Sequence, residues 1–505
     1  MVSNLVAALK LVLTPQSLVV IPLGIVMGQI LGAIPGLTGM MAIALLMPMT
    51  YYMDPVPSLL LLIAITTGAL FGGALPSILI NTPGTPAAAA TAIDGYQLAL
   101  KGKSMKAAKM ALYASVSADT FSDIVLLFVA PPLASLALKF GPPEYASLIV
   151  FSFTIIAAVS GTSILKGVIA ALIGVIIACI GVDPIAGIPR FMFGRVELYE
   201  GVPLLPMMIG IFALSEAFTQ FGKKSLRSAT ETFLPISHDP DDNRVTRGEF
   251  KRSAKHILRA SVIGTFLGAV PGIGPTISAF VSYSEAQRTS PNRAEFGHGA
   301  IEGVAAAEAG NSAVSGANLI PLLSLGVPGD ATAAVLLGAF MVHGISPGPM
   351  LFQKHATIMY AFFLGLILCN LANLVFGHVL IHVSRRICTF RKALVLPVIV
   401  TLCCVGAYAV NSSMFDVKLM FAFGLLGYIM TRMRLPIAPL VIGFVLQPLA
   451  ESSIRQTLII SGGRVAPFFT RPISILFMIL TVLSVVFAVV RSRQKTQDPR
   501  LVEEG

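Results

Sequence analysis

Long, nearly uncharged apolar stretches recur along the chain and limit what it can fold into. Examples are residues 202–221, 360–383 and 473–490. The hydrocarbon core of a bilayer is about 30 Å thick, and a helix needs about 20 residues to cross it. Charged residues make up only 12% of the sequence, about half the share found in soluble domains. The sequence therefore predicts an all-α polytopic integral membrane protein with about 10–14 transmembrane segments.

The formal net charge of +11 comes largely from bases that lie between the apolar stretches. The basic segments are 101–109, 222–259, 385–392, 432–434 and 491–505, and the base-poor segments are 139–144, 183–200 and 346–355. Lys and Arg accumulate in cytoplasmic loops, so we expect the basic segments and the C-terminus in the cytoplasm and the others outside. Residues 145–182 then form a hairpin that turns near Gly161. Bases distributed in this way indicate membrane topology and no nucleic-acid partner.

An internal repeat organises the sequence. The string GQILGAIPG at 28–36 is similar to GTFLGAVPG at 264–272. Further along, Pro83 and Gly84 after the first string match Pro328 and Gly329 after the second. The charge bias of the flanking loops is reversed between the copies, which predicts two repeats of inverted topology, as in many secondary transporters. We expect a first repeat at 17–138, connecting spans at 139–221, a cytoplasmic loop at 222–259, a second repeat at 260–383, C-terminal spans at 384–490 and a cytoplasmic tail at 491–505.

Each copy contains two helix interruptions, which read PGLTG at 35–39, NTPGTP at 81–86, PGIGP at 271–275 and GVPGD at 326–330. Proline and glycine break helices, and lipid tolerates such breaks only where protein or a watery cavity covers them. A half-helix that restarts after a break presents unpaired N–H groups and a positive dipole end, which favours an anion. The predicted substrate-binding residues are Gly36, Thr38, Asn81, Thr82, Gly84, Thr85, Gly272, Gly274, Thr276 and Gly329. The simpler alternative for any one break is a kink.

A polar stripe of small and amide side chains precedes the fourth break, at residues 302–321, and Thr66 and Thr67 occupy the position of Asn311 and Ser312 in the first copy. Side-chain oxygens suit a hard cation, so we predict a Na⁺ site formed by Asn311, Ser312, Asn318 and Asp330. The alternative is that these groups hydrogen-bond between helices, with Asp330 as an N-cap.

Several other acids lie in or near apolar stretches, namely Asp94, Asp119, Asp123, Asp183 and Glu216. An acid inside a membrane is a functional candidate because its placement there is costly. Asp119 and Asp123 form an i,i+4 pair, for which a position near the membrane interface is the simpler reading. The sequence contains no metal-ligand cluster, nucleophile elbow or phosphate-binding loop. We therefore expect no enzyme activity and no cofactor other than Na⁺ as a candidate coupling ion.

The strings GAIPGLTG, GGALPSILINTPGTPAAAATAIDGY and GAVPGIGPT, with LGVPGD further on, resemble the large membrane subunit of the tripartite tricarboxylate transporters. This resemblance covers nearly the whole chain. It implies a multi-pass protein of a bacterial inner membrane that imports an organic carboxylate, driven by an ion gradient of Na⁺ or H⁺. It also implies two partners, a small four-span membrane subunit and a periplasmic solute-binding protein. The alternatives are a passive anion channel and an intramembrane enzyme, for which an acid–base or metal cluster is missing.

Overall fold

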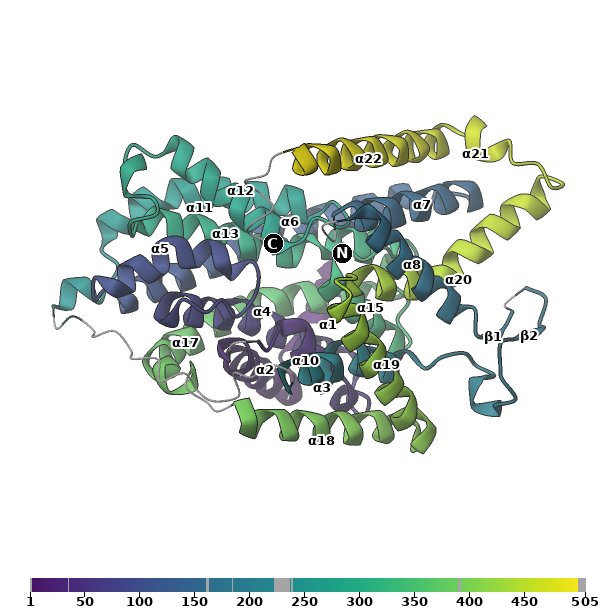
Figure 1. The fold of residues 1–505 in the computed structure, drawn as a ribbon, viewed down its shortest axis with the longest axis horizontal. Helices are drawn as coiled ribbons and strands as arrows, with labels where there is room; N and C mark the ends of the chain where they lie inside the picture. Colours follow the sequence, from purple (N-terminus) through teal and green to yellow (C-terminus); the bar gives the residue numbers. More distant parts are fainter. Residues whose placement is uncertain are drawn as a thin grey trace.

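The computed structural model describes residues 2–34, 36–159, 163–183, 185–221, 237, 239–388 and 392–497. The predicted hairpin turn at Gly161, Pro35 of the first break, most of the 222–238 segment and the end of the tail lie outside these residues. The secondary structure of the described chain is almost entirely helical, with one antiparallel β-hairpin whose two strands have two residues each. This architecture confirms the predicted all-α polytopic class (Figure 1).

The first part of the chain runs through six helices, which are α1 (Val2–Val12), α2 (Pro15–Ala33), α3 (Gly39–Thr50), α4 (Pro55–Ile80), α5 (Ala88–Leu100) and α6 (Ser104–Ala137). Of these, α2 to α6 lie within or overlap residues 17–138, the predicted first repeat. Connecting elements follow: α7 (Pro142–Val159), α8 (Ile164–Ala178), β1 (Gly181–Val182), β2 (Pro189–Arg190), η1 (Val196–Leu198), α9 (Leu204–Met208), the π-helical η2 (Ile209–Leu214) and α10 (Ser215–Phe221).

The second half begins with η3 (Pro240–Asp242) and repeats the same order of long and short helices. Its elements are α11 (Arg247–Gly268), α12 (Pro275–Thr289), η4 (Arg293–Glu295), α13 (Ile301–Ala317), α14 (Leu319–Leu325), α15 (Ala331–Val342), α16 (Leu351–Lys354) and α17 (Ala356–Cys388). The chain ends in α18 (Lys392–Asn411), α19 (Met414–Arg432), α20 (Ile437–Ile460), α21 (Pro467–Thr470) and α22 (Pro472–Gln497).

Helix α11 begins earlier than the hydropathy pattern predicted. A capping box starts it: the Thr246 hydroxyl accepts from the Glu249 N–H, while the Glu249 carboxylate accepts from the Thr246 N–H. These two bonds satisfy backbone donors that a helix start leaves unpaired. Residues 247–259 of the predicted loop are therefore helical, because local capping offsets their polar composition.

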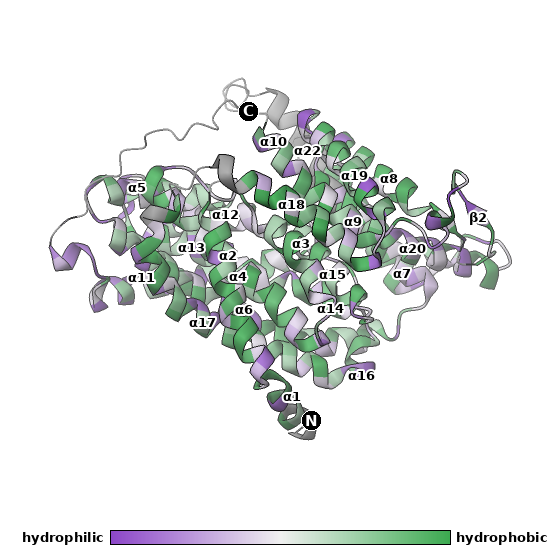
Figure 2. Cartoon of the chain, turned by 90° about the horizontal axis from the view of Figure 1, so that it is seen from below, coloured by the Kyte–Doolittle hydropathy of each residue, from purple (hydrophilic) through white to green (hydrophobic). Residues whose placement is uncertain are grey.

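Seven helices of the described chain are long and apolar enough to cross a bilayer: α2, α4, α6, the α9–α10 segment, α17, α19 and α20. Shorter apolar helices accompany them, among them the half-helices α3 and α15. The hydropathy of the sequence does not separate the long helices from the short ones, so the predicted 10–14 transmembrane segments include both kinds. Large apolar side chains such as Leu165, Val398 and Val482 are more than half exposed, and Figure 2 shows the outer helices α8, α18 and α19 as mostly hydrophobic. This surface suits lipid.

Glycines let the long helices of each half touch backbone to backbone. A Cβ added to Gly28 on α2 would lie 2.2 Å from the Ile65 carbonyl oxygen of α4, and one on Gly72 would lie 2.4 Å from the Gln29 oxygen. In the second half, Gly264 on α11 packs in the same way against the Gly310 oxygen of α13. Small residues permit such contact in membrane helices. The pairs α2–α4 and α11–α13 thus pack alike, as a repeat requires.

Contacts between loops agree with the two sides that the charge rule predicted. Lys103 pairs with Asp242 at 2.9 Å and Lys106 with Glu249 at 2.8 Å, which joins two basic segments. The predicted outer loop instead contacts the far end of α20, where Arg455 lies 2.6 Å from Asp183. In Figure 1, α5 and α11 lie at one end of the long axis and the β1–β2 hairpin at the other. Which end faces the cytoplasm stays a prediction.

Candidate functional site

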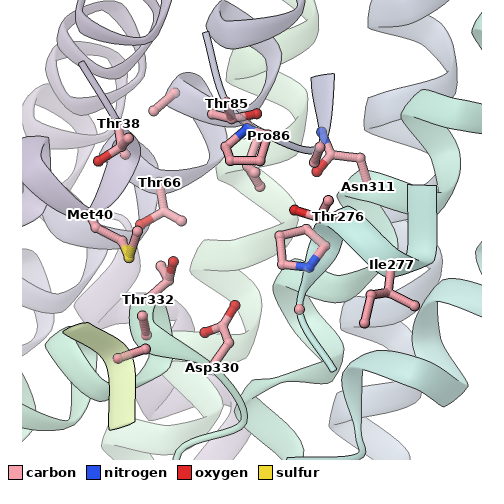
Figure 3. A pocket seen from close by; sticks show the side chains of 18 of the residues that line it. Thr38, Met40, Thr66, Thr85, Pro86, Thr276, Ile277, Asn311, Asp330 and Thr332 are labelled. Carbon is pink, nitrogen blue, oxygen red and sulfur yellow. The ribbon is translucent and has the colours of Figure 1, made fainter. Parts of the chain in front are cut away.

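The four helix interruptions meet at one cavity of about 410 Å³ inside the protein. Each of the half-helices α3, α5, α12 and α15 begins at this cavity, although they are far apart in the sequence (Figure 3). The residues that line it are Thr38, Gly39, Met40, Thr66, Ala69, Leu70, Thr85, Pro86, Ala87, Gly272, Gly274, Pro275, Thr276, Ile277, Asn311, Asp330, Ala331, Thr332, Ala438 and Ile442. The cavity is large enough for a small organic molecule.

In the first half, a threonine stands at the start of each short helix. Thr38 is the N-cap of α3, and its hydroxyl accepts from the Met41 N–H at 3.3 Å. Before α5, the Thr85 hydroxyl accepts from the Ala88 N–H at 3.3 Å. A threonine hydroxyl is both donor and acceptor. Each one can cap its helix and still donate a hydrogen bond into the cavity.

In the second half, the two breaks are joined to each other. The Gly272 N–H donates to the Gly329 carbonyl at 2.7 Å, so the segment before α12 is fixed against the segment before α15. Helix α12 then starts at Gly274 and Pro275, and no side chain caps it. Asp330 caps α15 and accepts from the Ala333 N–H at 2.8 Å. The start of α12 therefore leaves the least satisfied backbone amides of the four.

The cavity combines helix dipoles with few fixed charges. Four helix N-termini converge on it, and each contributes a partial positive charge of about half an elementary charge. Among the described residues that line it, Asp330 is the one with an ionisable side chain, and no Lys or Arg takes part. Hydroxyls come from Thr38, Thr66, Thr85, Thr276 and Thr332. Such a surface can hold a carboxylate through backbone amides and hydroxyls, provided a cation offsets Asp330.

A second, smaller cavity of about 20 Å³ shares part of this lining. It lies between α4, α13, α12 and α15, and both cavities are bordered by Thr66, Asn311, Asp330 and Thr332. The buried amide oxygens of Asn311 and Asn318 have no hydrogen-bond partner there. A void of this size holds one water molecule, and its oxygens suit a small hard cation equally well.

Residues 18–442 match the sequence profile of the Tripartite tricarboxylate transporter TctA family. The chain belongs to the TctA family. A relative from Agrobacterium vitis, described as an uncharacterized 52.8 kDa protein of the TAR-I ttuC' 3' region, is 35% identical over all of this chain and 99% of its own length. A second, described as an uncharacterized protein of the TAR-II ttuC' 3' region, is 36% identical over 48% of this chain and its whole own length. No solved structure matches the chain.

This TctA-family chain brings about half of the predicted substrate-binding residues to the main cavity. Thr38, Thr85, Gly272, Gly274 and Thr276 line it, whereas Gly36, Asn81, Thr82, Gly84 and Gly329 do not. Two of the latter serve backbone packing instead. A Cβ on Gly84 would lie 2.8 Å from the Gly32 oxygen, and one on Gly329 would lie 2.9 Å from the Asn318 oxygen.

The conformations of the remaining residues explain why they were attractive candidates. Asn81 adopts a left-handed conformation with φ of 51° and ends α4, while Gly36 has φ of 91°. The Thr82 hydroxyl donates to the Ile80 carbonyl at 3.2 Å. These residues form the breaks, but the cavity begins further along, at the next helix start.

The predicted cation-binding residues are likewise divided. Asn311 and Asp330 border both cavities and Asn318 borders the smaller one. Ser312 borders neither of them. Its hydroxyl lies 2.7 Å from that of Ser115 on α6, so it joins two helices, as the alternative reading expected. The predicted set of four is therefore not gathered at one point.

Sequence reasoning missed residues that come from outside the break motifs. Ala438 and Ile442 on α20 close one wall of the cavity, and Met40 and Thr332 follow directly after two helix starts. Thr66 lies at the repeat position of Asn311 and also lines the cavity, although the predicted ligands do not include it. In the described part of the chain, no group of three or more His, Cys, Asp or Glu side chains forms a metal site.

Proposed function

We propose that this TctA-family protein is the large permease subunit of a tripartite, binding-protein-dependent secondary transporter that imports an organic carboxylate with Na⁺ or H⁺. The observation that carries the proposal is the convergence of four helix N-termini on one cavity without a Lys or Arg in its lining. Broken helices that offer their dipole ends to an anionic substrate are typical of secondary transporters.

Cation coupling follows from the charge of the cavity. A carboxylate placed among the half-helix starts would share the cavity with Asp330, and two like charges at close range repel. A cation or a proton bound with the substrate would offset this repulsion. The buried oxygens of Asn311 and Asn318 beside Asp330 offer a place for it. Substrate and ion would then bind together, which is the basis of coupled transport.

The wider assembly rests on the family. A TctA subunit implies companion subunits, and we propose a small four-span membrane protein and a periplasmic solute-binding protein that delivers the carboxylate. We also propose that the two structurally similar halves are inverted in the membrane, so that one repeat-built core moves against the remaining helices. An inner membrane location with a cytoplasmic C-terminus completes this arrangement.

Reconstitution in proteoliposomes tests the proposal. We expect uptake of a carboxylate from a panel, supplied with the candidate binding protein, to exceed its equilibrium level when a Na⁺ or H⁺ gradient is imposed. Thr276→Val should raise the substrate concentration for half-maximal uptake about 10- to 100-fold, because a hydrogen bond to a charged group is worth about 1.5–3 kcal/mol. Thr401→Val, which changes an exposed threonine of α18, is the matched control. An uncoupled carboxylate current without accumulation would support a passive anion channel instead.

A further inference from the structure

Two aspartates lie buried in the middle of α6, away from the residues that line the cavity. Asp119 and Asp123 are each only 3% exposed, and their i,i+4 spacing places them on one face of the helix. Their side chains are packed against α13 and α17. The sequence suggested an interfacial position for this pair. The structure instead places it in the protein interior.

No cation offsets this pair within the described part of the chain, where neither aspartate takes part in an ion pair. Asn370 on α17 donates from Nδ2 to Asp123 Oδ2 at 2.7 Å, and Ser315 on α13 interacts with the Asp119 carboxyl. Gly316 of α13 packs closely against the pair: a Cβ added there would lie 2.4 Å from Asp123 Oδ1, so no side chain fits at this position.

Three buried oxygens remain without a partner: Asp119 Oδ1, Asp123 Oδ1 and Asn370 Oδ1. Asn370 is 2% exposed and comes from a different helix, so its free acceptor adds to those of the two aspartates. Buried acceptors without a donor are unfavourable in a dry interior. A bound proton supplies the missing donor.

Repulsion between the two carboxylates also favours a bound proton. Two carboxylates that lie close together out of water, without a cation, cannot both stay ionised. We propose that Asp119 and Asp123 together hold one exchangeable proton and that its binding is coupled to carboxylate transport. This inference rests on the proposed transport function for its coupling, but not for the proton itself.

A polar connection leads from the pair to the candidate site. Ser315, which interacts with Asp119, also borders the smaller cavity. That cavity is lined in turn by Asn311 and Asp330, which reach the main cavity. A change in the protonation of Asp119 can therefore alter the hydrogen bonds of Ser315 one step from the residues that face the substrate.

Other titratable groups on the neighbouring helices are engaged elsewhere or neutral. The buried Cys369 thiol of α17 lies close enough to both aspartates to feel their charges. Glu308 of α13 accepts from Thr91, His378 of α17 lies 3.1 Å from the Tyr113 hydroxyl, Asp94 of α5 accepts from Tyr283, and His256 of α11 faces Glu302. Lys106 on α6 itself pairs with Glu249, more than three turns away from Asp119. Arg259 of α11 borders a surface pocket with Phe280 and Ser284 of α12. Among the described residues, the groups that act on Asp119 and Asp123 include no cation.

Infrared difference spectroscopy on the purified full-length protein tests the proton directly and needs no transport. We expect the wild type to lose a protonated-carboxyl C=O band when the pH is raised. Part of this band should be missing in Asp119→Asn and in Asp123→Asn but retained in Asp416→Asn, a control that changes a buried aspartate of α19. Asn370→Ala keeps both carboxyls, and the midpoint of the band should move to higher pH because Asp123 loses a donor. A wild-type band that neither aspartate variant alters would overturn the proposal.

Transport then tests the coupling. In the assembled transporter the initial uptake rate should fall as the pH rises, by up to about tenfold per pH unit once the proton is lost. Asp119→Asn and Asp123→Asn should flatten this dependence to less than about twofold, while Asp416→Asn keeps it. Variants that keep the wild-type pH profile would show that the proton is not coupled. If no carboxylate is transported at all, the transport function fails, while the infrared result still decides the proton.

Discussion

Asp94 on α5 and Tyr283 on α12 join the two halves of the chain. The Tyr283 hydroxyl donates to Asp94 Oδ2 at 2.9 Å, and Asp94 Oδ1 accepts from the N–H groups of Gly297, Gly299 and Ala300 at 2.8–2.9 Å. One fully buried carboxylate of the first half thus fixes the loop that leads into α13 of the second half. Asp94 thereby links α5, a half-helix of the first half, to α12, a half-helix of the second half, and both helices begin at the cavity.

The donors around Asp94 predict a graded loss of stability. Asp94→Ala leaves three backbone donors and one hydroxyl without their acceptor, which should cost about 3–5 kcal/mol. Tyr283→Phe removes a single hydrogen bond to a charged group and should cost about 1.5–3 kcal/mol. The apparent melting temperature in detergent should fall in that order, with Ser117→Ala on α6, an exposed position, as an unchanged control. Equal losses for Asp94→Ala and Tyr283→Phe would contradict the role of Asp94 in holding the loop.

Helix contact at Gly28 predicts that even a methyl group is too large there. The added Cβ of Gly28→Ala would lie 2.2 Å from a backbone oxygen of α4, so the two helices must move apart. Overpacking of this kind costs about 1–3 kcal/mol. Gly248→Ala is the matched control, because that glycine is exposed in α11 with nothing within 4 Å, and it should be neutral or stabilising. Thermal unfolding of both variants decides; a Gly28→Ala protein as stable as the control would refute the close contact.

Much of the site could be predicted because Pro and Gly carry a local signal. The breaks before Thr38, Thr85, Gly274 and Asp330 were located from the sequence, and the structure begins a half-helix at or just after each one. The match of Thr66 with Asn311 was also useful, since both border the same cavities. A repeat indicates which positions are equivalent without saying how the copies meet.

Other features depend on tertiary contacts that no local pattern encodes. Ala438 and Ile442 read as ordinary membrane-helix residues, because hydropathy does not separate a cavity wall from a lipid-facing surface. Gly84 and Gly329 looked like amide donors, but their lack of a side chain serves backbone packing. The burial of Asp119 could not be foreseen, since an i,i+4 acidic pair looks the same at an interface and in an interior.

The proposed inversion of the two halves predicts where equivalent loops lie. Lys101 follows α5, and the exposed Ser346 follows α15, the corresponding half-helix of the second half. Single cysteines at these positions, in a chain whose five native cysteines are replaced, should react with a membrane-impermeant thiol reagent from opposite sides. The loop charges place residue 101 in the cytoplasm and residue 346 outside. Labelling of both from the same side would establish a parallel duplication.

The contacts of Asp183 in the β1–β2 hairpin predict a pH range over which the fold of this hairpin is unchanged. Backbone N–H groups of Ala186 and Ile185 and the Arg455 guanidinium hold the pKa of Asp183 well below its ordinary value, with the Ala186 N–H as the largest cause. A lowered pKa means that the stabilisation is complete above the ordinary value of about 3.9 and disappears only as the pH falls through the folded-state pKa. Hydrogen exchange of residues 185–187, corrected for its intrinsic pH dependence, should therefore stay constant from about pH 5 to 8.

Asp183→Ala should speed that exchange at every pH in this range, because Ile185 and Ala186 lose an acceptor 2.8 Å away. Glu197→Ala changes an exposed acid of η1, which follows the hairpin, and should have no effect. Exchange that already accelerates between pH 8 and 5 in the wild type would mean that Asp183 titrates near its ordinary pKa.

Asp330 can serve as a helix cap or as a ligand of the coupling cation, and one substitution distinguishes these two roles. It caps α15 through the Ala333 N–H, and it borders both cavities beside Asn311 and Asn318. Asparagine caps helices as well as aspartate does, so Asp330→Asn removes the charge and keeps the cap.

If Asp330 serves only as a cap, the variant should match the wild type in stability and in transport. If it helps to bind the coupling cation, its thermal stability should change by less than about 1 kcal/mol, while the Na⁺ or H⁺ concentration for half-maximal uptake rises about tenfold or more, the equivalent of about 1.4 kcal/mol. Asp330→Ala should lose both the cap and the cation dependence. We expect the second outcome, since an acid at an anion-binding cavity without a cation would weaken the binding that the four helix starts provide.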